Sequence, residues 1–72
     1  MTLILSNALV NTMHFSCIYM DDGNLVLEGT TTVVISGVPS DALAKIAVAA
    51  SEERSYVEFE NGILELEDTD EN

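Results

Sequence analysis

The chain has 72 residues, 47% of them hydrophobic, and its 13 acidic side chains face only two basic ones, a formal net charge of −11 at pH 7. A chain of this length forms one domain with a small core, which we expect to span residues 1–67. The charge excludes direct binding to nucleic acid, whose phosphates are contacted by lysine and arginine, disfavours anionic membrane surfaces, and makes a basic protein surface the expected partner.

The first 20 residues predict strands. Residues 2–5 and 8–10 are short apolar runs interrupted by Ser6 and Asn7, and they form either one irregular strand or two short ones. Residues 13–20 alternate along the chain, but both resulting faces are largely apolar. This pattern predicts a central strand, or a strand that is covered on both sides.

A turn and a longer strand follow. Asp22 and Gly23 can supply the positive φ angles of a type I′ turn. Residues 25–35 are rich in Val and Thr and predict one strand, in which Gly29 marks a bulge or bend. Four apolar residues of this strand share an inward side only if that irregularity preserves the register: Leu25, Leu27, Val33 and Ile35.

The single predicted helix runs from about Asp41 to Glu53, with Ser40 as its N-cap. Its buried stripe follows the i, i+3, i+4, i+7 spacing of one helix face: Leu43, Ile46, Ala47 and Ala50. The opposite side holds Ala44 and Val48 instead of charges. A helix that is apolar nearly all round is buried on two sides or covered by a second subunit, so we expect Ala44 and Val48 to form an oligomer interface.

Residues 56–67 have the pattern of a tight β-hairpin that turns at Asn61 and Gly62. A two-residue turn places Glu58 directly opposite Glu65. It also separates an apolar face (Val57, Phe59, Leu64, Leu66) from an acidic face, which consists of Glu58, Glu60, Glu65 and Glu67. Like charges opposite each other destabilise a sheet by about 0.2–1 kcal/mol per pair. An acidic face retained at this cost indicates a binding surface.

The predicted fold class is α+β: a small antiparallel sheet of four or five strands with one helix packed on one face, in the order β-β(-β)-α-β-β. Tight hairpins imply antiparallel pairing, and one helix covers one face of such a sheet. Residues 68–72 contain no apolar anchor, and we expect them to form a disordered acidic tail.

Catalytic and metal-binding chemistry is not expected. His14 has no triad-like spacing around it and is expected to be a satisfied or surface strand histidine. Cys17 is the only cysteine, so no intrachain disulfide or zinc site forms, and we expect it in the core of a protein from a reducing environment. Residues 68–71 lack the Gly and the closing Glu of a calcium loop. We expect a non-enzymatic protein without a cofactor.

The acidic residues near the C-terminus form a continuous series: Glu52, Glu53, Glu58, Glu60, Glu65, Glu67, Asp68 and Asp70. Alternate strand residues are about 6.8 Å apart, a distance on the scale of successive DNA phosphates, which follow each other every ~3.4 Å of axis. Over residues 52–72 the chain resembles the phage-encoded inhibitors that act as DNA mimics, anti-CRISPR and anti-restriction proteins in particular. The resemblance is one of class, without a shared motif. It implies that these eight residues bind the basic channel where a nuclease or CRISPR effector complex grips DNA.

Two other functions stay open from the sequence. The chain could be a small homodimeric structural or assembly module, whose acidic surface serves only solubility. It could also be an immunity protein or antitoxin that masks one basic toxin. The N-terminus lacks the positive charge of a signal peptide, and no apolar run approaches the ~20 residues that span a bilayer. We therefore expect a cytoplasmic protein, in the host bacterium if the chain is phage-encoded.

Overall fold

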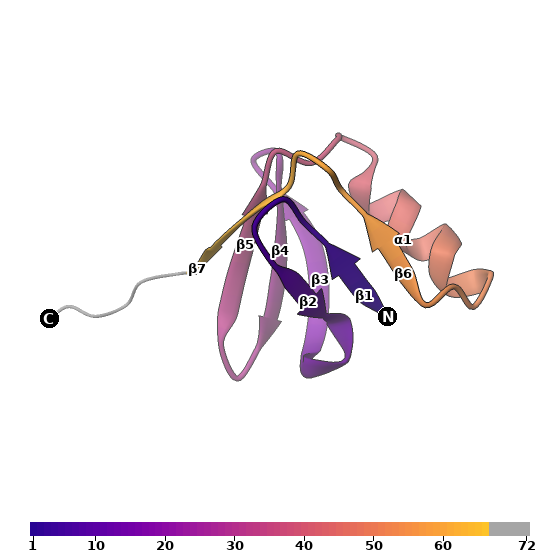
Figure 1. The fold of residues 1–72 in the computed structure, drawn as a ribbon. Coiled ribbons are helices and arrows are strands. Elements are labelled where there is room, and N and C mark those ends of the chain that lie inside the picture. The colour runs from indigo at the N-terminus through magenta and orange to yellow at the C-terminus, as the bar shows by residue number, and fades with distance from the viewer. Residues whose placement is uncertain (67–72) are drawn as a thin grey trace, which may run out of the picture.

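The structure, a computed structural model, describes residues 1–66. Its elements in chain order are β1 (Thr2–Ile4), β2 (Leu9–Asn11), the 3₁₀ helix η1 (Thr12–His14), β3 (Phe15–Asp21), β4 (Asn24–Gly29), β5 (Thr32–Ser36), α1 (Ala42–Ser51), β6 (Tyr56–Glu58) and β7 (Ile63–Leu66). The strands form a three-stranded sheet, β2-β1-β6, and a four-stranded sheet, β3-β4-β5-β7 (Figure 1). The α+β class with one helix is confirmed over these residues, although the strands divide into two sheets.

The turn between β3 and β4 confirms the prediction at Asp22 and Gly23. Their φ angles are 54° and 82°, both positive as a type I′ turn requires. Asp21 pairs with Asn24 directly before and after the turn, so only two residues connect the strands. The register of this hairpin therefore follows from the local sequence.

The predicted single strand over residues 25–35 is wrong, because the chain reverses at Thr30 and Thr31 and forms β4 and β5. Leu25 pairs with Ile35 and Leu27 with Val33, and all four side chains are buried. The four residues do share one inward side, but across a hairpin instead of along one strand. The irregularity expected at Gly29 occurs opposite it, where the register shifts between Phe15 and Cys17 of β3.

The predicted C-terminal hairpin is also wrong. β6 pairs in parallel with β1, where Glu58 lies opposite Ile4, and β7 pairs antiparallel with β5, where Glu65 lies opposite Val34. The turn at Asn61-Gly62 exists, but it carries the chain from one sheet to the other. Phe59 explains the crossing, because its side chain is buried in the core and its N–H donates to the Ile4 carbonyl at 2.8 Å. The arrangement also avoids placing glutamates opposite each other.

Helix α1 is shorter than predicted and turns a different side to the core. Its N-cap is Asp41, without a side-chain capping bond, and not Ser40. Of the predicted stripe only Ile46 is buried; the buried residues are Ala42, Ile46 and Ala49. The helix packs on β6 and β3. Small alanine side chains on the inward side allow this close packing, which leaves the larger Leu43 37% exposed.

The helix ends in a left-handed turn. Arg54 N–H donates to the Ala49 carbonyl at 2.9 Å and Glu53 N–H to the Ala50 carbonyl at 3.1 Å, the paired bonds of a Schellman motif. Glu53 occupies the position at which glycine is usual, with a φ of 58°. The motif sends the chain back toward β6 and thereby positions Arg54 beside the helix.

The two sheets enclose one core, which gathers buried residues from both sheets, the helix and the β6–β7 connection: Leu3, Leu5, Val10, Leu25, Leu27, Val33, Ile35, Ala42, Ile46 and Phe59. The β1–β2 turn ties the sheets together. Ser6 N–H donates to the Gly62 carbonyl at 2.8 Å, and the Asn7 side chain bonds both the N–H and the carbonyl of Leu64, at 2.9 and 3.3 Å. Across residues 1–66, no helix has the length and apolarity needed to traverse a membrane.

Candidate functional site

The acidic residues predicted to share one face are distributed over the molecule. Glu52 and Glu53 follow the helix, Glu58 lies on β6, Glu60 in the β6–β7 connection and Glu65 on β7. All five are exposed, but they belong to different sheets and connections. The single acidic hairpin face therefore does not form. The remaining predicted partner-binding residues lie outside the described residues: Glu67, Asp68 and Asp70.

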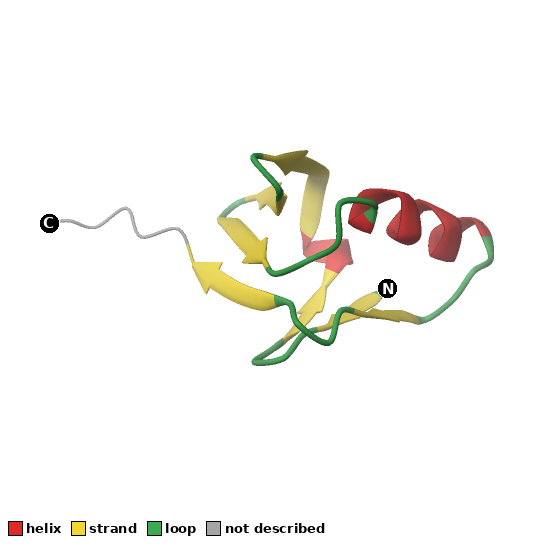
Figure 2. Cartoon of the chain, turned by 90° about the horizontal axis from the view of Figure 1, so that it is seen from above, coloured by secondary structure: helices red, strands yellow, loops and turns green. Residues whose placement is uncertain are grey.

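The topology instead brings three acidic segments to one end of the molecule. Figure 1 shows the β3–β4 turn, the β5–α1 connection and the β6–β7 connection at the same end, and Figure 2 looks down on it. The latter two connections touch, since the Asn61 carbonyl lies against Gly37. We call this surface the acidic end and define it by its exposed carboxylates: Asp21, Asp22, Asp41, Glu58 and Glu60.

Sequence reasoning missed the contribution of Asp21, Asp22 and Asp41 to this surface. The β3–β4 turn was recognisable from its composition, but its place beside the other connections depends on long-range strand pairing. Lys45 is the cation that borders the acidic end, where it lines a shallow depression with Glu58 and Glu60. Its Nζ lies 3.9 Å from a carboxylate oxygen of Asp41. Five carboxylates stand against this one cation, so the acidic end keeps a net negative charge.

Two further carboxylates lie on the outer face of the four-stranded sheet, opposite the core residues Leu25, Leu27, Val33 and Ile35. Glu28 accepts a 2.6 Å hydrogen bond from the Tyr19 hydroxyl, and Glu65 accepts one of 3.3 Å from the Ser36 hydroxyl. The bond to Glu28, with desolvation and nearby negative charge as smaller causes, raises the pKa of Tyr19 to about 12. These two carboxylates are thus partly engaged by neighbours within the sheet.

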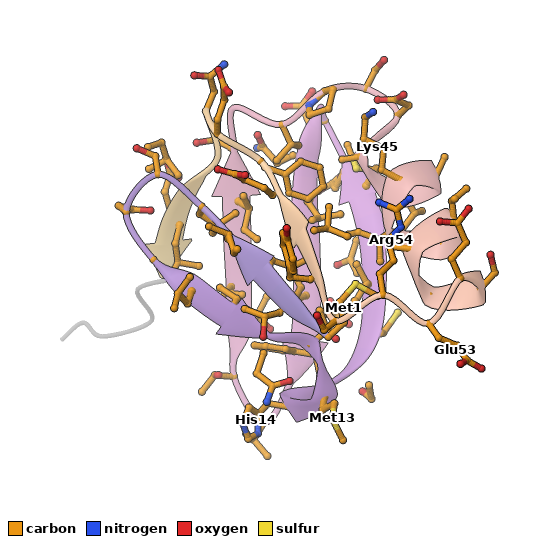
Figure 3. The ribbon with its side chains drawn as sticks, turned by 45° about the vertical axis from the view of Figure 1, so that its right-hand side comes forward. Met1, Met13, His14, Lys45, Glu53 and Arg54 are labelled. Carbon is orange, nitrogen blue, oxygen red and sulfur yellow. The ribbon has the colours of Figure 1, made fainter. Side chains whose placement is uncertain are left out.

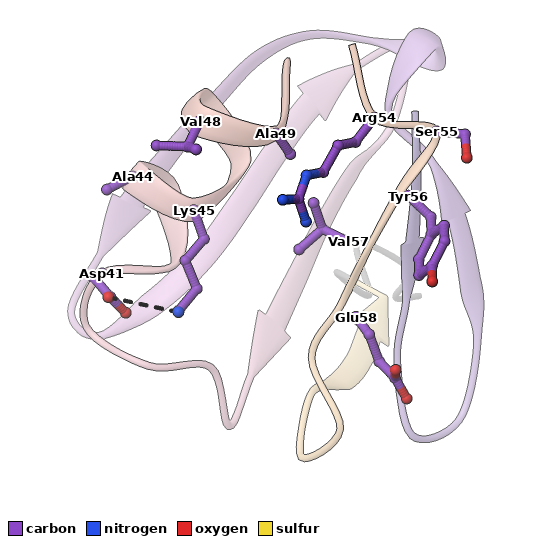
Figure 4. Close-up of a pocket in the computed structure, with 10 residues that line it drawn as sticks. All are labelled: Asp41, Ala44, Lys45, Val48, Ala49, Arg54, Ser55, Tyr56, Val57 and Glu58. Atoms are coloured by element: carbon purple, nitrogen blue, oxygen red, sulfur yellow. Dashed lines mark ion pairs between the residues drawn. The ribbon is translucent and has the colours of Figure 1, made fainter. Parts of the chain in front are cut away.

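A groove of about 740 Å³ separates α1 from β6 (Figure 4). Both basic side chains of the chain, Lys45 and Arg54, line it. Ala44 and Val48, the predicted oligomer interface, form part of its helix wall, and Val48 is 53% exposed. Arg54 Nε donates to Glu52 at 2.8 Å. The two cations of this protein thus share one groove, which Asp41 and Glu58 of the acidic end also line.

The two residues considered for chemistry lie elsewhere. His14 is exposed at the end of η1 and not in a strand, and Figure 3 shows it beside Met13 at the end opposite Lys45. Cys17 was expected in the core but is exposed, because the register shift in β3 changes which residues face inward. Residues 1–66 contain no group of three side chains able to hold a metal ion.

No protein-family model, curated protein or solved structure matches this chain. Function therefore has to be inferred from surfaces and charges of the molecule itself. The described residues offer two adjoining surfaces: the acidic end, whose exposed carboxylates come from three connections and the strand ends beside them, and the α1–β6 groove, which carries the two cations and shares Asp41 and Glu58 with the acidic end.

Proposed function

We propose that the protein is an inhibitor that binds the basic, DNA-contacting surface of a nuclease or CRISPR effector complex through its acidic end. DNA is then kept from that surface because the carboxylates occupy the Arg and Lys side chains that would hold phosphates. The observation that supports this proposal best is that three connections lie at one end of the molecule and, together with the adjoining ends of β3 and β6, carry five exposed carboxylates. No catalytic step is part of the mechanism.

The electrostatics of the described residues favour such a role. Residues 1–66 bury no charged side chain, so the carboxylates of the acidic end, apart from Asp41 with its contact to Lys45, are available for bidentate pairing with arginine. Surfaces that serve solubility alone usually mix both signs of charge, whereas in the described part of this chain Lys45 is the one cation beside the five carboxylates of the acidic end. A single-signed surface speeds the encounter with a basic partner and makes the binding depend on salt.

The proposal replaces the expected row of carboxylates along a hairpin with a cluster spread over three connections. Such a cluster imitates the charge of a DNA backbone without reproducing a regular spacing of phosphates. Its negative field extends about 8 Å into solvent at physiological ionic strength. The partner is then selected by its positive charge and by its shape around the acidic end.

A two-step experiment tests this function. Immobilised protein captures partners from a bacterial lysate at low salt, and duplex DNA is then used to displace them. We expect a defined DNA-binding protein that DNA and rising NaCl release, and whose DNA cleavage or DNA binding the free protein inhibits. The variant Asp21→Lys/Glu60→Lys should lose the capture. A partner that DNA does not displace would contradict the proposal. It would fit an antitoxin that masks a toxin at a surface other than a DNA-binding site.

The matched control is the double variant Glu52→Lys/Glu65→Lys. Each double variant changes the net charge from −11 to −7, but only the first alters the acidic end. If both lose capture equally, net charge rather than the acidic end determines binding. Circular dichroism melts of both variants verify that they are folded.

A homodimeric assembly module is the second candidate, because Val48 is 53% exposed and Leu43 is 37% exposed on the same helix. Sedimentation of the wild-type protein and of Val48→Asp separates the two functions. A monomer that still inhibits DNA binding supports the inhibitor. A dimer that dissociates in Val48→Asp, together with unchanged capture by Asp21→Lys/Glu60→Lys, supports the module.

A further inference from the structure

Strand β6 presents an unpaired edge to the α1–β6 groove. β6 is the outermost strand of its sheet, next to β1. Thr2 N–H donates to the Ser55 carbonyl at 2.9 Å and Phe59 N–H donates to the Ile4 carbonyl at 2.8 Å. In a parallel pair this register directs the N–H and carbonyl of Val57 toward β1 as well. The backbone groups of Tyr56 and Glu58 therefore point away from β1.

The groove lies on that free side of β6. Residues 55–58 form one wall and α1 forms the other. In Figure 4 the side chains of Lys45 and Arg54 extend into the space between helix and strand, whereas those of Tyr56 and Glu58 point away from the helix. What β6 offers to the groove is thus its backbone donors and acceptors together with the Val57 side chain, which points toward the helix.

Another strand edge is covered in a way that the β6 edge is not. On β7, the side-chain amide of Asn7 bonds both backbone groups of Leu64, at 2.9 and 3.3 Å, and so occupies the positions that an added strand would use. Unprotected strand edges are sites at which other chains add a strand. Among the edges of the described strands, β6 combines free backbone groups with an apolar wall and positive charge.

We propose that the α1–β6 groove, which adjoins the acidic end at Asp41 and Glu58, is a docking site for an extended segment of a partner protein that carries an Asp or Glu side chain. The segment adds to β6 as a further strand. Its backbone pairs with Tyr56 and Glu58, and its carboxylate binds Arg54 and Lys45. Main-chain hydrogen bonds supply affinity and side-chain pockets supply selection in this mode of peptide recognition.

The dimensions and the charge of the groove agree with this occupant. Its volume of about 740 Å³ falls within the roughly 300–1,000 Å³ of ligand sites, and four extended residues span about 13 Å. The helix wall at Ala44 and Val48 contacts alternate apolar side chains of the segment. In the hydrogen bonds of residues 1–66, the Arg54 guanidinium uses Nε for Glu52, which leaves its Nη groups to a carboxylate. Asp41 and Glu58 also line the groove, but outside it the chain has no lysine or arginine that could bind an acidic segment.

Selection from a random heptapeptide display library tests the proposal without assuming a sequence. We expect the enriched peptides to contain Asp or Glu beside β-branched or apolar residues. ¹⁵N-labelled protein titrated with the best synthetic peptide should show protection of the Tyr56 and Glu58 amides from hydrogen exchange. A proline version of the same peptide, which cannot pair its backbone, should not bind.

Two variants locate the binding. Tyr56→Pro removes one N–H that points into the groove, at the first position of an outer strand, where proline is tolerated; we expect at least tenfold weaker binding. Tyr56→Thr keeps that N–H and is the matched control, with unchanged affinity. Arg54→Gln removes the charge without altering the β6 backbone and should weaken binding at least fivefold. Thermal melts identify any variant that fails to fold.

Several results would overturn the proposal. One is a selection in which no peptide is enriched on the wild-type protein relative to the Tyr56→Pro protein. Another is a set of enriched peptides that are basic, or that bind Arg54→Gln as tightly as the wild type. Self-association that Tyr56→Pro abolishes, without peptide binding, would show that a second copy occupies the groove instead. Unchanged peptide binding by Asp21→Lys/Glu60→Lys is expected, since neither Asp21 nor Glu60 lines the groove, so the two proposals can fail separately.

Discussion

At the scale of single residues, the bond between Tyr19 and Glu28 gives the outer face of the four-stranded sheet a defined response to alkaline pH. The phenol donates to the carboxylate at 2.6 Å, which raises the pKa of Tyr19 from 10 to about 12. Because this pKa is raised in the folded protein, the stabilisation from the pair is complete below pH 10. It is lost as the pH rises from 10 to about 12, where a phenolate would face Glu28.

We predict that ultraviolet titration of a Tyr56→Phe variant, in which Tyr19 is the only tyrosine left, has its midpoint near pH 12. Adding Glu28→Gln should lower the midpoint toward pH 10, since an amide carries no charge to oppose the phenolate. A midpoint that does not move on this exchange would show that Glu28 is not the cause. Fluorescence recorded at each pH distinguishes titration of the folded protein from alkaline unfolding.

Several residues could be assigned from local sequence, and others could not. The positive φ angles at Asp22 and Gly23 follow from turn chemistry that involves only neighbours, and this prediction is confirmed. Cys17 was placed in the core because its strand alternates, but the register shift beside it comes from the contact between β3 and β4. The left-handed φ of Glu53 is another such case, since no glycine marks that helix end.

At the scale of elements, the contact between the β5–α1 connection and the β6–β7 connection holds the acidic end together. Gly37 has a φ of 74°, and a methyl group there would overlap the Asn61 carbonyl oxygen. Gly23 has a φ of 82°, but a methyl group there would meet no atom within 4 Å. Both glycines have a positive φ, but only Gly37 has other atoms close to the position of an added methyl group.

We predict that Gly37→Ala destabilises the protein by about 3 kcal/mol, the sum of ~1–2 kcal/mol for a left-handed residue and ~1–3 kcal/mol for overpacking. Gly23→Ala should cost only the first contribution, about 1 kcal/mol. Urea denaturation of both variants measures the difference. Equal losses would mean that the two connections separate readily and that their contact does not order the acidic end.

The elements themselves were predicted better than their partners. Helix, turns and most strands occur where periodicity placed them, but β6 and β7 pair with β1 and β5 instead of with each other. Taken alone, the Asn61-Gly62 turn and the alternation around it are fully compatible with a hairpin. Burial of Phe59 between the sheets decides against it, and this decision depends on residues far away in the sequence.

At the scale of the whole molecule, composition predicts an acidic surface but not its distribution. The acidic end is assembled from three connections that only the strand order brings together. The groove likewise joins Lys45 of α1 with Arg54, which a Schellman motif directs beside it. Both candidate surfaces are therefore consequences of topology, and the sequence shows only which residues are present to form them.

If the acidic end concentrates the charge, its carboxylates should repel one another more than isolated ones do. We predict that Glu60→Gln raises the melting temperature in 10 mM NaCl by a few degrees, which corresponds to roughly 0.5 kcal/mol in a domain of this size. Glu65→Gln removes the same charge from β7, where the Ser36 hydroxyl bonds the carboxylate, and should raise it less. In 0.5 M NaCl the difference should vanish, because screening then acts within a few ångströms. Calorimetry of the three proteins at both salt concentrations gives the comparison. Equal increases in melting temperature for the two variants at low salt would mean that the repulsion is spread evenly over the surface. The carboxylates of the acidic end would then repel one another no more than other carboxylates do.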